Sequence, residues 1–187
     1  MARAGLSTDR VVDEAAQLAD EVGIGGLSFA ALAERLGVKV PSLYKHVASL
    51  DGVRQAISVR AKAELADAMG AAAIGLSSGE AIRAVAFAYR AWAGAHPGRY
   101  ATTLRAAAPG DADDVGASQR SVEVIFSSLA GYGLTREQTI DATRMLRSSL
   151  HGFVALEAAG GFVLPLDVDR SFDVMVTALD RALSDWP

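Results

Sequence analysis

The sequence contains no cysteine among its 187 residues. This absence excludes disulfide bonds, thiolate metal ligands and thiol nucleophiles, and it is compatible with a reducing compartment. Long apolar runs are missing too, because no uninterrupted stretch approaches the roughly 18 residues of a membrane-spanning helix. The charged segment 1–7 is not followed by an apolar run, so it lacks the pattern of a signal peptide. We therefore expect a soluble, cytoplasmic protein that does not contact a membrane.

Proline and aromatic residues are also scarce. The chain has five prolines and 6% aromatic residues, whereas 51% of its residues are hydrophobic and many of these are alanine. This composition favours packed helices over a β-rich fold. We predict an all-α protein.

Positive charge is not in excess, since the formal net charge is −4 and the isoelectric point is near 5.3. A protein that coats nucleic acid needs clustered lysine and arginine, because phosphate contacts dominate such binding. The composition therefore disfavours RNA-binding and nucleoid-packing proteins. Any affinity for DNA has to come from a local surface.

Apolar residues recur at helical spacing along most of the chain, interrupted by glycine and proline. The pattern predicts about nine helices. We place them at 8–22, 28–36, 41–47, 53–69, 82–96, 97–107, 115–129, 135–159 and 172–186. Thr135 and Gln138 have the spacing of a capping box, and no helix breaker follows them before residue 159, so we expect 135–159 to be the longest helix.

Residues 28–47 have the pattern of a helix-turn-helix. Gly37 can adopt the positive φ of a tight turn, and Ala33 is small enough for two helices to cross closely. The predicted shared core consists of Leu32, Leu36, Val38 and Leu43. In such a motif the second helix protrudes and enters a major groove about 12 Å wide, while the first helix braces it.

The exposed side chains of this motif are suited to phosphates and base edges. The DNA-binding candidates are Ser28, Lys39, Val40, Pro41, Ser42, Tyr44, Lys45 and His46. Cations and hydroxyl groups are natural phosphate partners, whereas Val40, Pro41 and the Tyr44 ring can contact thymine methyl groups. The alternative is a purely structural helical hairpin.

The segment 26–47 resembles the TetR family of repressors. Leu36-Gly37-Val38, followed by Ser42-Leu43-Tyr44 and then by Val47, is a specific signature of that family. The resemblance implies a helix-turn-helix DNA-binding domain at 1–50 and a ligand-binding and dimerisation domain at 51–187. It also implies a fourth helix that links the two, and a homodimer formed by the last two long helices.

Two positions depart from the family pattern. Many relatives have an Asn-Lys pair where this chain has Ser49-Leu50-Asp51, and Phe29 stands where some relatives have a polar or basic residue. Because the motif has fewer cations, we expect DNA binding to rest more on hydroxyl and backbone N–H contacts. The dependence on salt should then be shallow, since its slope scales with the number of phosphates neutralised.

The body resembles, more loosely, a C-terminal subgroup marked by Trp, His and Gly, through segments 92–100 and 150–153. Aromatic and methionine side chains at helical spacing are candidates for an effector pocket, and the alternative is that they are plain core. The ligand-binding candidates are Trp92, His96, Tyr100, Phe126, Met145 and Phe153. The effector expected from them is a small apolar or amphipathic molecule.

Small residues form a stripe along the helix predicted at 135–159. Its members are Ser148, Gly152, Ala155 and Ala159, the dimer-interface candidates. Such a stripe lets another helix approach closely. The alternative is that it packs against helices of the same chain.

Enzyme motifs are missing from the sequence. His46, His96 and His151 lie far apart and none has a second ligand at metal spacing, so we expect no metal and no cofactor. There is no nucleophile elbow and no phosphate-binding glycine loop, which argues against an enzyme.

The function that these observations predict is a sequence-specific transcription regulator that binds double-stranded operator DNA as a homodimer. It would act as a repressor and leave the operator when a small-molecule effector binds. An activator is equally compatible with the sequence, because promoter position decides between the two. The remaining alternative is a helical ligand-binding or scaffold protein that has lost operator recognition.

Overall fold

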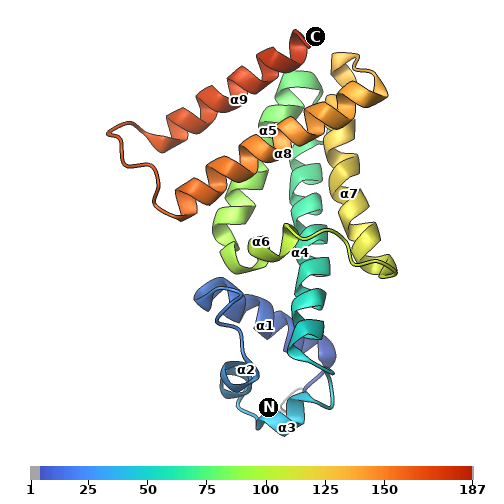
Figure 1. Cartoon of the computed structure of the whole chain (residues 1–187), viewed down its shortest axis with the longest axis vertical. Helices are drawn as coiled ribbons and strands as arrows, with labels where there is room; N and C mark the ends of the chain where they lie inside the picture. Colours follow the sequence, from blue (N-terminus) through green and yellow to red (C-terminus); the bar gives the residue numbers. More distant parts are fainter. Residues whose placement is uncertain (1–4, 187) are drawn as a thin grey trace. The chain divides into compact units, whose positions relative to one another are not determined.

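The computed structural model describes residues 5–186, and over this range the chain forms nine α-helices, one 3₁₀ turn and no strand (Figure 1). The elements are α1 (Thr8–Val22), α2 (Phe29–Leu36), α3 (Val40–Leu43), α4 (Leu50–Ala73), α5 (Ser78–Ala95), α6 (Pro97–Thr103), α7 (Ala112–Leu129), η1 (Ala130–Tyr132), α8 (Arg136–Ala158) and α9 (Val168–Ser184). The all-α prediction is confirmed. Residues 1–4 of the predicted DNA-binding domain and Pro187 lie outside the described residues.

Two predictions about helix length were wrong. The longest helix in the described range is α4, with 24 residues, whereas α8 has 23. Gly70 lies inside α4 without ending it, because burial of the neighbouring apolar face outweighs the low helix propensity of one glycine. Helix α3 ends at Leu43 rather than at residue 47, since the amides of His46 and Val47 both donate to the Leu43 carbonyl and close a turn.

Two compact units make up the chain, and they do not follow the chain order. Of the described residues, the first contains 5–62 and 96–118, and the second contains 63–95 and 119–186. Helices α4 and α7 each contribute residues to both units. The division predicted at residue 50 separates a DNA-binding part from a ligand-binding part. The compact units do not test this division, so it stays a prediction.

Helices α1, α2 and α3 surround the core of the first unit together with the start of α4, and we call these three helices the head. Its buried residues are Val11, Val12, Ala15, Leu18, Leu27, Leu32, Ala33, Leu43, Val53 and Ile57. Leu32 and Leu43 are therefore core as predicted, and Leu36 and Val38 pack against this core while partly exposed. Gly37 has a φ of 65°, the left-handed conformation expected at the turn.

Helix α6 packs tightly against the end of α1. A Cβ atom on Gly98 would lie only 1.8 Å from the carbonyl oxygen of Ala19, so no other residue fits at this position without a shift. Asp20 accepts hydrogen bonds from the backbone amide of Arg99 at 2.8 Å and from its guanidinium at 2.7 Å. The His96 ring lies beside the same groups, with Nδ1 at 2.8 Å from the guanidinium of Arg99. This contact joins α6 to the head.

In the second unit, α8 and α9 pack along α5 (Figure 1). Phe172 of α9 is fully buried, and Phe87 and Phe153 lie edge-on to its ring. The Arg90 guanidinium of α5 stacks over Phe172, 4.8 Å from the ring centre, and it also pairs with Glu157. Ion pairs and ring contacts thus join three helices at one point. No helix in the described part of the chain is both long and apolar enough to span a bilayer.

We predict that Gly98→Ala lowers the free energy of unfolding by about 1–3 kcal/mol, because the added methyl group overlaps the backbone of α1. Gly116→Ala is the matched control. Its Cβ would meet nothing within 4 Å inside α7, so it should stabilise the protein by about 0.5–1 kcal/mol through helix propensity. Urea unfolding of both variants tests this, and equal effects would contradict the tight α1–α6 packing.

Candidate DNA interface and effector groove

The turn and third helix of the head hold most of the predicted DNA-binding residues at the surface. Ser28 begins α2 as its N-cap, and its hydroxyl accepts a hydrogen bond from the Ala31 amide at 3.2 Å. Lys39 is the N-cap of α3, and Pro41 lies in its first turn, where a missing N–H costs nothing. Leu43 is 0% exposed and anchors this short helix to the core.

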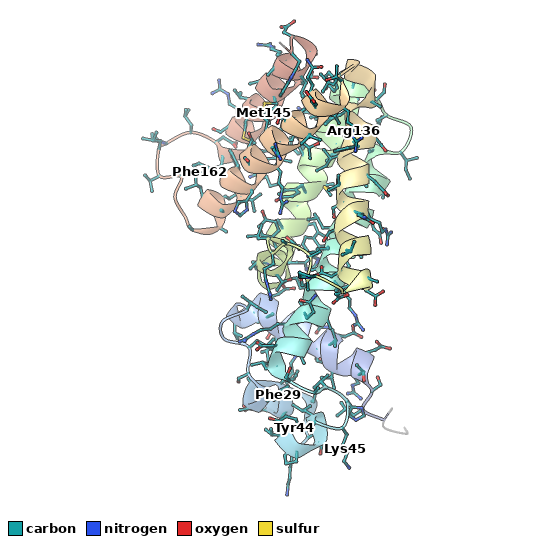
Figure 2. All side chains as sticks on the ribbon, turned by 45° about the vertical axis from the view of Figure 1, so that its right-hand side comes forward. Phe29, Tyr44, Lys45, Arg136, Met145 and Phe162 are labelled. Atoms are coloured by element: carbon teal, nitrogen blue, oxygen red, sulfur yellow. The ribbon has the colours of Figure 1, made fainter. Side chains whose placement is uncertain are left out.

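Tyr44 and Lys45 follow Leu43 and are exposed, with the Tyr44 side chain 58% accessible. Figure 2 shows both at one end of the head, with Phe29 next to Tyr44. The Tyr44 ring packs against Phe29 in an edge-to-face arrangement, with the ring centres 5.1 Å apart. Phe29 therefore supports the Tyr44 ring, while more than half of Tyr44 stays exposed.

Lysine side chains supply the positive charge of this surface. Lys39 and Lys45 are exposed, and neither makes an ion pair with the residues that the structure describes. The other candidates, Val40, Ser42 and His46, are half-buried, and Val40 packs partly against the head core. The structure thus brings the eight candidates into one continuous segment of surface plus the start of α2.

Two residues of this surface were not predicted from the sequence. The Thr8 hydroxyl of α1 donates to the His46 carbonyl at 3.0 Å and so fixes the turn after α3. Phe29 braces Tyr44, whereas the sequence had marked it only as a departure from the family pattern. The aromatic residues at the start of α2 and just after α3, on neighbouring short helices, were a signal that could have pointed to the ring contact.

A buried ion pair joins the first half of α4 to the start of α7. Lys62 donates to Asp114 at 2.5 Å, and their side chains are 5% and 2% exposed. Gln55 donates to the same carboxylate at 2.8 Å, and the backbone amide of Ala108 donates to it at 2.9 Å. Burial alone would raise the pKa of Asp114, but the hydrogen bonds from Lys62, Ala108 and Gln55 lower it below its ordinary value.

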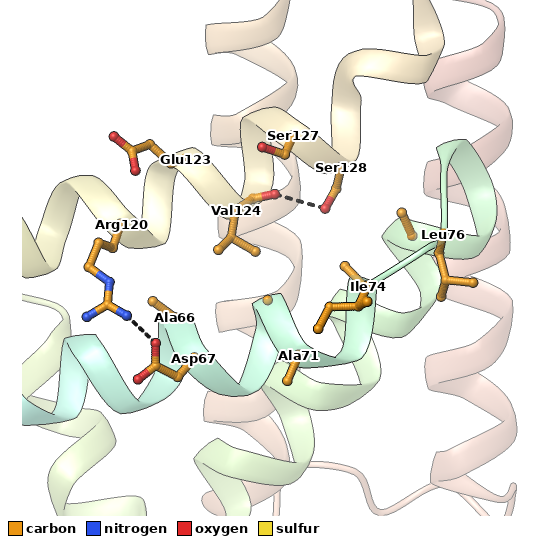
Figure 3. A pocket seen from close by; sticks show the side chains of 13 residues that line it. Ala66, Asp67, Ala71, Ile74, Leu76, Arg120, Glu123, Val124, Ser127 and Ser128 are labelled. Carbon is orange, nitrogen blue, oxygen red and sulfur yellow. Dashed lines mark hydrogen bonds and ion pairs between the residues drawn. The ribbon is translucent and has the colours of Figure 1, made fainter.

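Residues of α4, α5 and α7 that belong to the second unit line an open groove of about 530 Å³ (Figure 3). Its floor is apolar and lies where α4 approaches α7, since a Cβ on Gly70 would be 3.5 Å from the Val124 methyl group. Ile74 and Leu76 extend the apolar surface around the α4–α5 turn. This volume is typical of small-molecule sites.

Charged groups lie at one end of the groove. The Arg120 guanidinium of α7 pairs with Asp67 of α4, as Figure 3 shows, and Glu123 lies one turn further along α7. Ser127 and Ser128 add hydroxyl groups, and Ser128 donates to the Val124 carbonyl at 2.9 Å. The groove therefore combines an apolar floor with a charged end.

The six predicted ligand-binding residues do not line this groove. His96 contacts Asp20 and Arg99 in the first unit, and Tyr100 is buried there. In the second unit, Phe153 packs against Phe172 and Phe162, and Met145 packs against the core. Trp92 and Phe126 are half-buried. Whether any of them contacts a ligand stays a prediction.

The small-residue stripe lies on the surface of α8. Ser148 and Ala155 are exposed, as is Ala159 at the end of the helix, and Gly152 is half-buried with open space around it. The stripe is thus not covered by helices of the same chain. Among the described residues, no cluster of three or more His, Asp or Glu side chains could hold a metal ion.

Both parts of the chain match family models. The model described as "Bacterial regulatory proteins, tetR family" matches residues 11–57, and the one described as "Tetracyclin repressor-like, C-terminal domain" matches residues 82–179. A three-helix head with a helix-turn-helix and a helical body thus define a transcription regulator. The chain belongs to the TetR family, which confirms the resemblance found in the sequence. The likeness of the body to the Trp-His-Gly subgroup stays a prediction.

Similar proteins match nearly the whole chain. An uncharacterised HTH-type transcriptional regulator of Mycobacterium tuberculosis is 36% identical over 177 residues, which cover 94% of this chain and 81% of the relative. A second, from Bacillus subtilis, is 34% identical over 175 residues, covering 93% and 91%. A solved TetR variant of Acinetobacter baumannii in complex with minocycline has the same fold, with a TM-score of 0.72 at 20% identity over 97% of this chain and 98% of that one.

We predict that Phe29→Ala weakens operator binding about two- to tenfold, because an aromatic pair contributes about 0.5–1.5 kcal/mol to holding Tyr44. Phe29→Tyr keeps the ring and should restore affinity. Titration of labelled operator at several salt concentrations measures both. The salt slope should not change, since no charge is removed. An altered slope, or no rescue by tyrosine, would contradict the bracing role.

We predict that Asp114→Asn lowers the free energy of unfolding by about 3 kcal/mol at pH 7, because Lys62 stays buried without its counter-charge. The folded-state pKa of Asp114 is lowered, so its contribution is complete above the unfolded value of about 3.9 and is lost as pH falls through the folded value. Urea unfolding of wild type and variant between pH 7 and pH 3.5 checks this. A stability difference that grows toward low pH would contradict it.

Proposed function

We propose that this protein is a dimeric, cytoplasmic repressor, not an enzyme, that binds a pseudo-palindromic operator and leaves it when a small molecule binds to the body. The observation that carries the proposal is the surface formed by Lys39, Tyr44 and Lys45. These side chains are exposed on and just after a short helix whose opposite side is buried. The major groove of DNA, about 12 Å wide, admits such a helix.

The charge of this surface sets how the DNA is held. Lys39 and Lys45 contact phosphates, and the hydroxyl groups of Ser42 and Tyr44 add neutral hydrogen bonds. Asp51 lies in the first turn of α4 and pairs with Arg54. The segment where many relatives have a lysine therefore carries an acidic residue here. Few phosphates are neutralised per subunit, and the affinity therefore depends only modestly on salt.

A second copy of this chain completes the operator-binding unit. The exposed small residues Ser148, Ala155 and Ala159 allow a partner helix to approach α8 closely. Leu156 of α8 and Val174 of α9 are more than half exposed and supply apolar area to the same kind of contact. A two-fold dimer places two copies of α3 in successive major grooves about 34–36 Å apart.

Release of the operator requires a ligand that binds one conformation of the dimer better than the other. Helix α4 carries Lys62 in the first unit and lines the groove with its second half. A ligand that changes the tilt of α4 shifts the spacing of the two copies of α3. The minocycline complex of the A. baumannii relative supports a small-molecule effector for this fold.

The alternative is a helical ligand-binding or scaffold protein that has lost operator recognition. The acidic start of α4 favours it, because Asp51 repels phosphates where a cation would attract them. It differs from the repressor in one measurable respect, which is the absence of any preferred DNA sequence.

Selection of bound duplexes from random DNA by the full-length protein tests the proposal. We expect a palindromic consensus whose half-sites are about 10–10.5 base pairs apart, or a multiple of this spacing. Lys39→Gln and Lys45→Gln should each weaken binding to that consensus and each lower the salt slope by about one per subunit. Arg136→Gln removes the same charge at the start of α8 and serves as the control. Recovery of no consensus would overturn the repressor and favour the alternative.

A further inference from the structure

The groove between α4 and α7 has apolar walls that nothing in the described chain covers. Ile74 is 80% exposed and Leu76 is 41% exposed at its rim. Large apolar side chains gathered beside a hollow of about 530 Å³ are costly to leave in water. The groove therefore offers an apolar part of a ligand a place to bind.

The charged end of the groove decides what kind of ligand fits. Asp67 pairs with the Arg120 guanidinium, and a second carboxylate, that of the exposed Glu123, lies at the rim of the same end. Because Asp67 and Arg120 already pair with each other, the excess negative charge resides on Glu123. Glu123 makes no ion pair with any residue that the structure describes. Charge complementarity thus favours a positively charged group at this end.

We propose that this groove binds amphipathic organic cations, with the cationic group beside Glu123 and Asp67 and the apolar part along Gly70, Val124 and Ile74. The inference deepens the proposed function, because it names the chemical class of the effector. Binding itself does not depend on operator recognition.

An anionic amphiphile fits less well. Its carboxylate would have to displace Asp67 from Arg120 and then lie among two carboxylates. A neutral amphiphile would bury the same apolar area but leave Glu123 without a partner. The order of affinity expected for ligands of equal chain length is therefore cation, neutral molecule and anion.

Occupation of the groove acts on the contact between α4 and α7. Gly70 and Val124 form the floor, where a single Cβ atom would already be in van der Waals contact across the two helices. A ligand lodged above this floor pushes apart the α4 and α7 segments that line it. This gives the tilt of α4 that the proposed release mechanism requires.

The test uses decyltrimethylammonium and decanoate below their micellar concentrations and decanol below its solubility limit, each titrated into the full-length protein by calorimetry. We expect the cation to bind more tightly than either of the others. Glu123→Gln should weaken cation binding about three- to fivefold, in keeping with one exposed ion pair. Glu137→Gln makes the same change in the first turn of α8 and should leave binding unchanged.

A second pair of variants tests the location. Gly70→Leu fills the floor of the groove and should abolish binding, whereas Gly116→Leu adds the same side chain to α7 where a Cβ meets nothing within 4 Å. Circular dichroism shows whether both variants keep their helices. If Gly70→Leu unfolds the chain, Ala71→Leu at the lining of the same groove replaces it.

Three results would overturn the inference. The first is that decanoate binds more tightly than decyltrimethylammonium and that Arg120→Gln abolishes its binding. The second is that the three amphiphiles bind equally tightly, and the third is that none of them binds. A palindromic consensus from the DNA selection would leave the repressor standing in all three cases. If the inference holds, decyltrimethylammonium should also lower the affinity of the wild type for that consensus, and the Gly70→Leu variant should not respond.

Discussion

Burial of Leu43 is the constraint on which the DNA-binding surface depends. A helix of four residues cannot form alone in water, because nucleation costs more than one turn of hydrogen bonds returns. Leu43 is fully buried among the residues of α1, α2 and α4, so it fixes the position and rotation of α3. Its neighbours Tyr44 and Lys45 are then turned outward. The contacts of Tyr44 with Phe29 and of Thr8 with the His46 carbonyl refine this placement.

Helices α4 and α7 are the two helices shared by the compact units, because each contributes residues to both. In the first unit the buried Lys62–Asp114 pair clamps them, and removal of either partner would leave an uncompensated charge. In the second unit Gly70 of α4 approaches Val124 of α7 closely, and the Asp67–Arg120 pair that joins the two helices is exposed. One part of the α4–α7 contact is thus firmly held, and the other is open to a ligand.

The sequence was sufficient for features that local chemistry decides. The capping box at Thr135 forms as predicted, Gly37 has the expected left-handed turn, and Leu32 and Leu43 lie in the head core. Features that depend on residues far apart in the chain could not be predicted from the sequence. The end of α3 is set by a turn tied to α1, the Gly98 contact requires the backbone of Ala19, and the groove arises where α4 meets α7. Periodicity marks apolar faces, but it does not say which face stays open.

Because the chain has no cysteine, the Lys45→Cys variant has a unique attachment point for an iron chelate that cleaves nearby DNA. With the selected operator, we predict two cleavage centres, one in the major groove of each half-site and about one helical turn, or a multiple of it, apart. The wild type, which has no cysteine to carry the chelate, should leave the operator intact. No cleavage by the Lys45→Cys variant, or cleavage outside both major grooves, would contradict the placement of α3 in the groove.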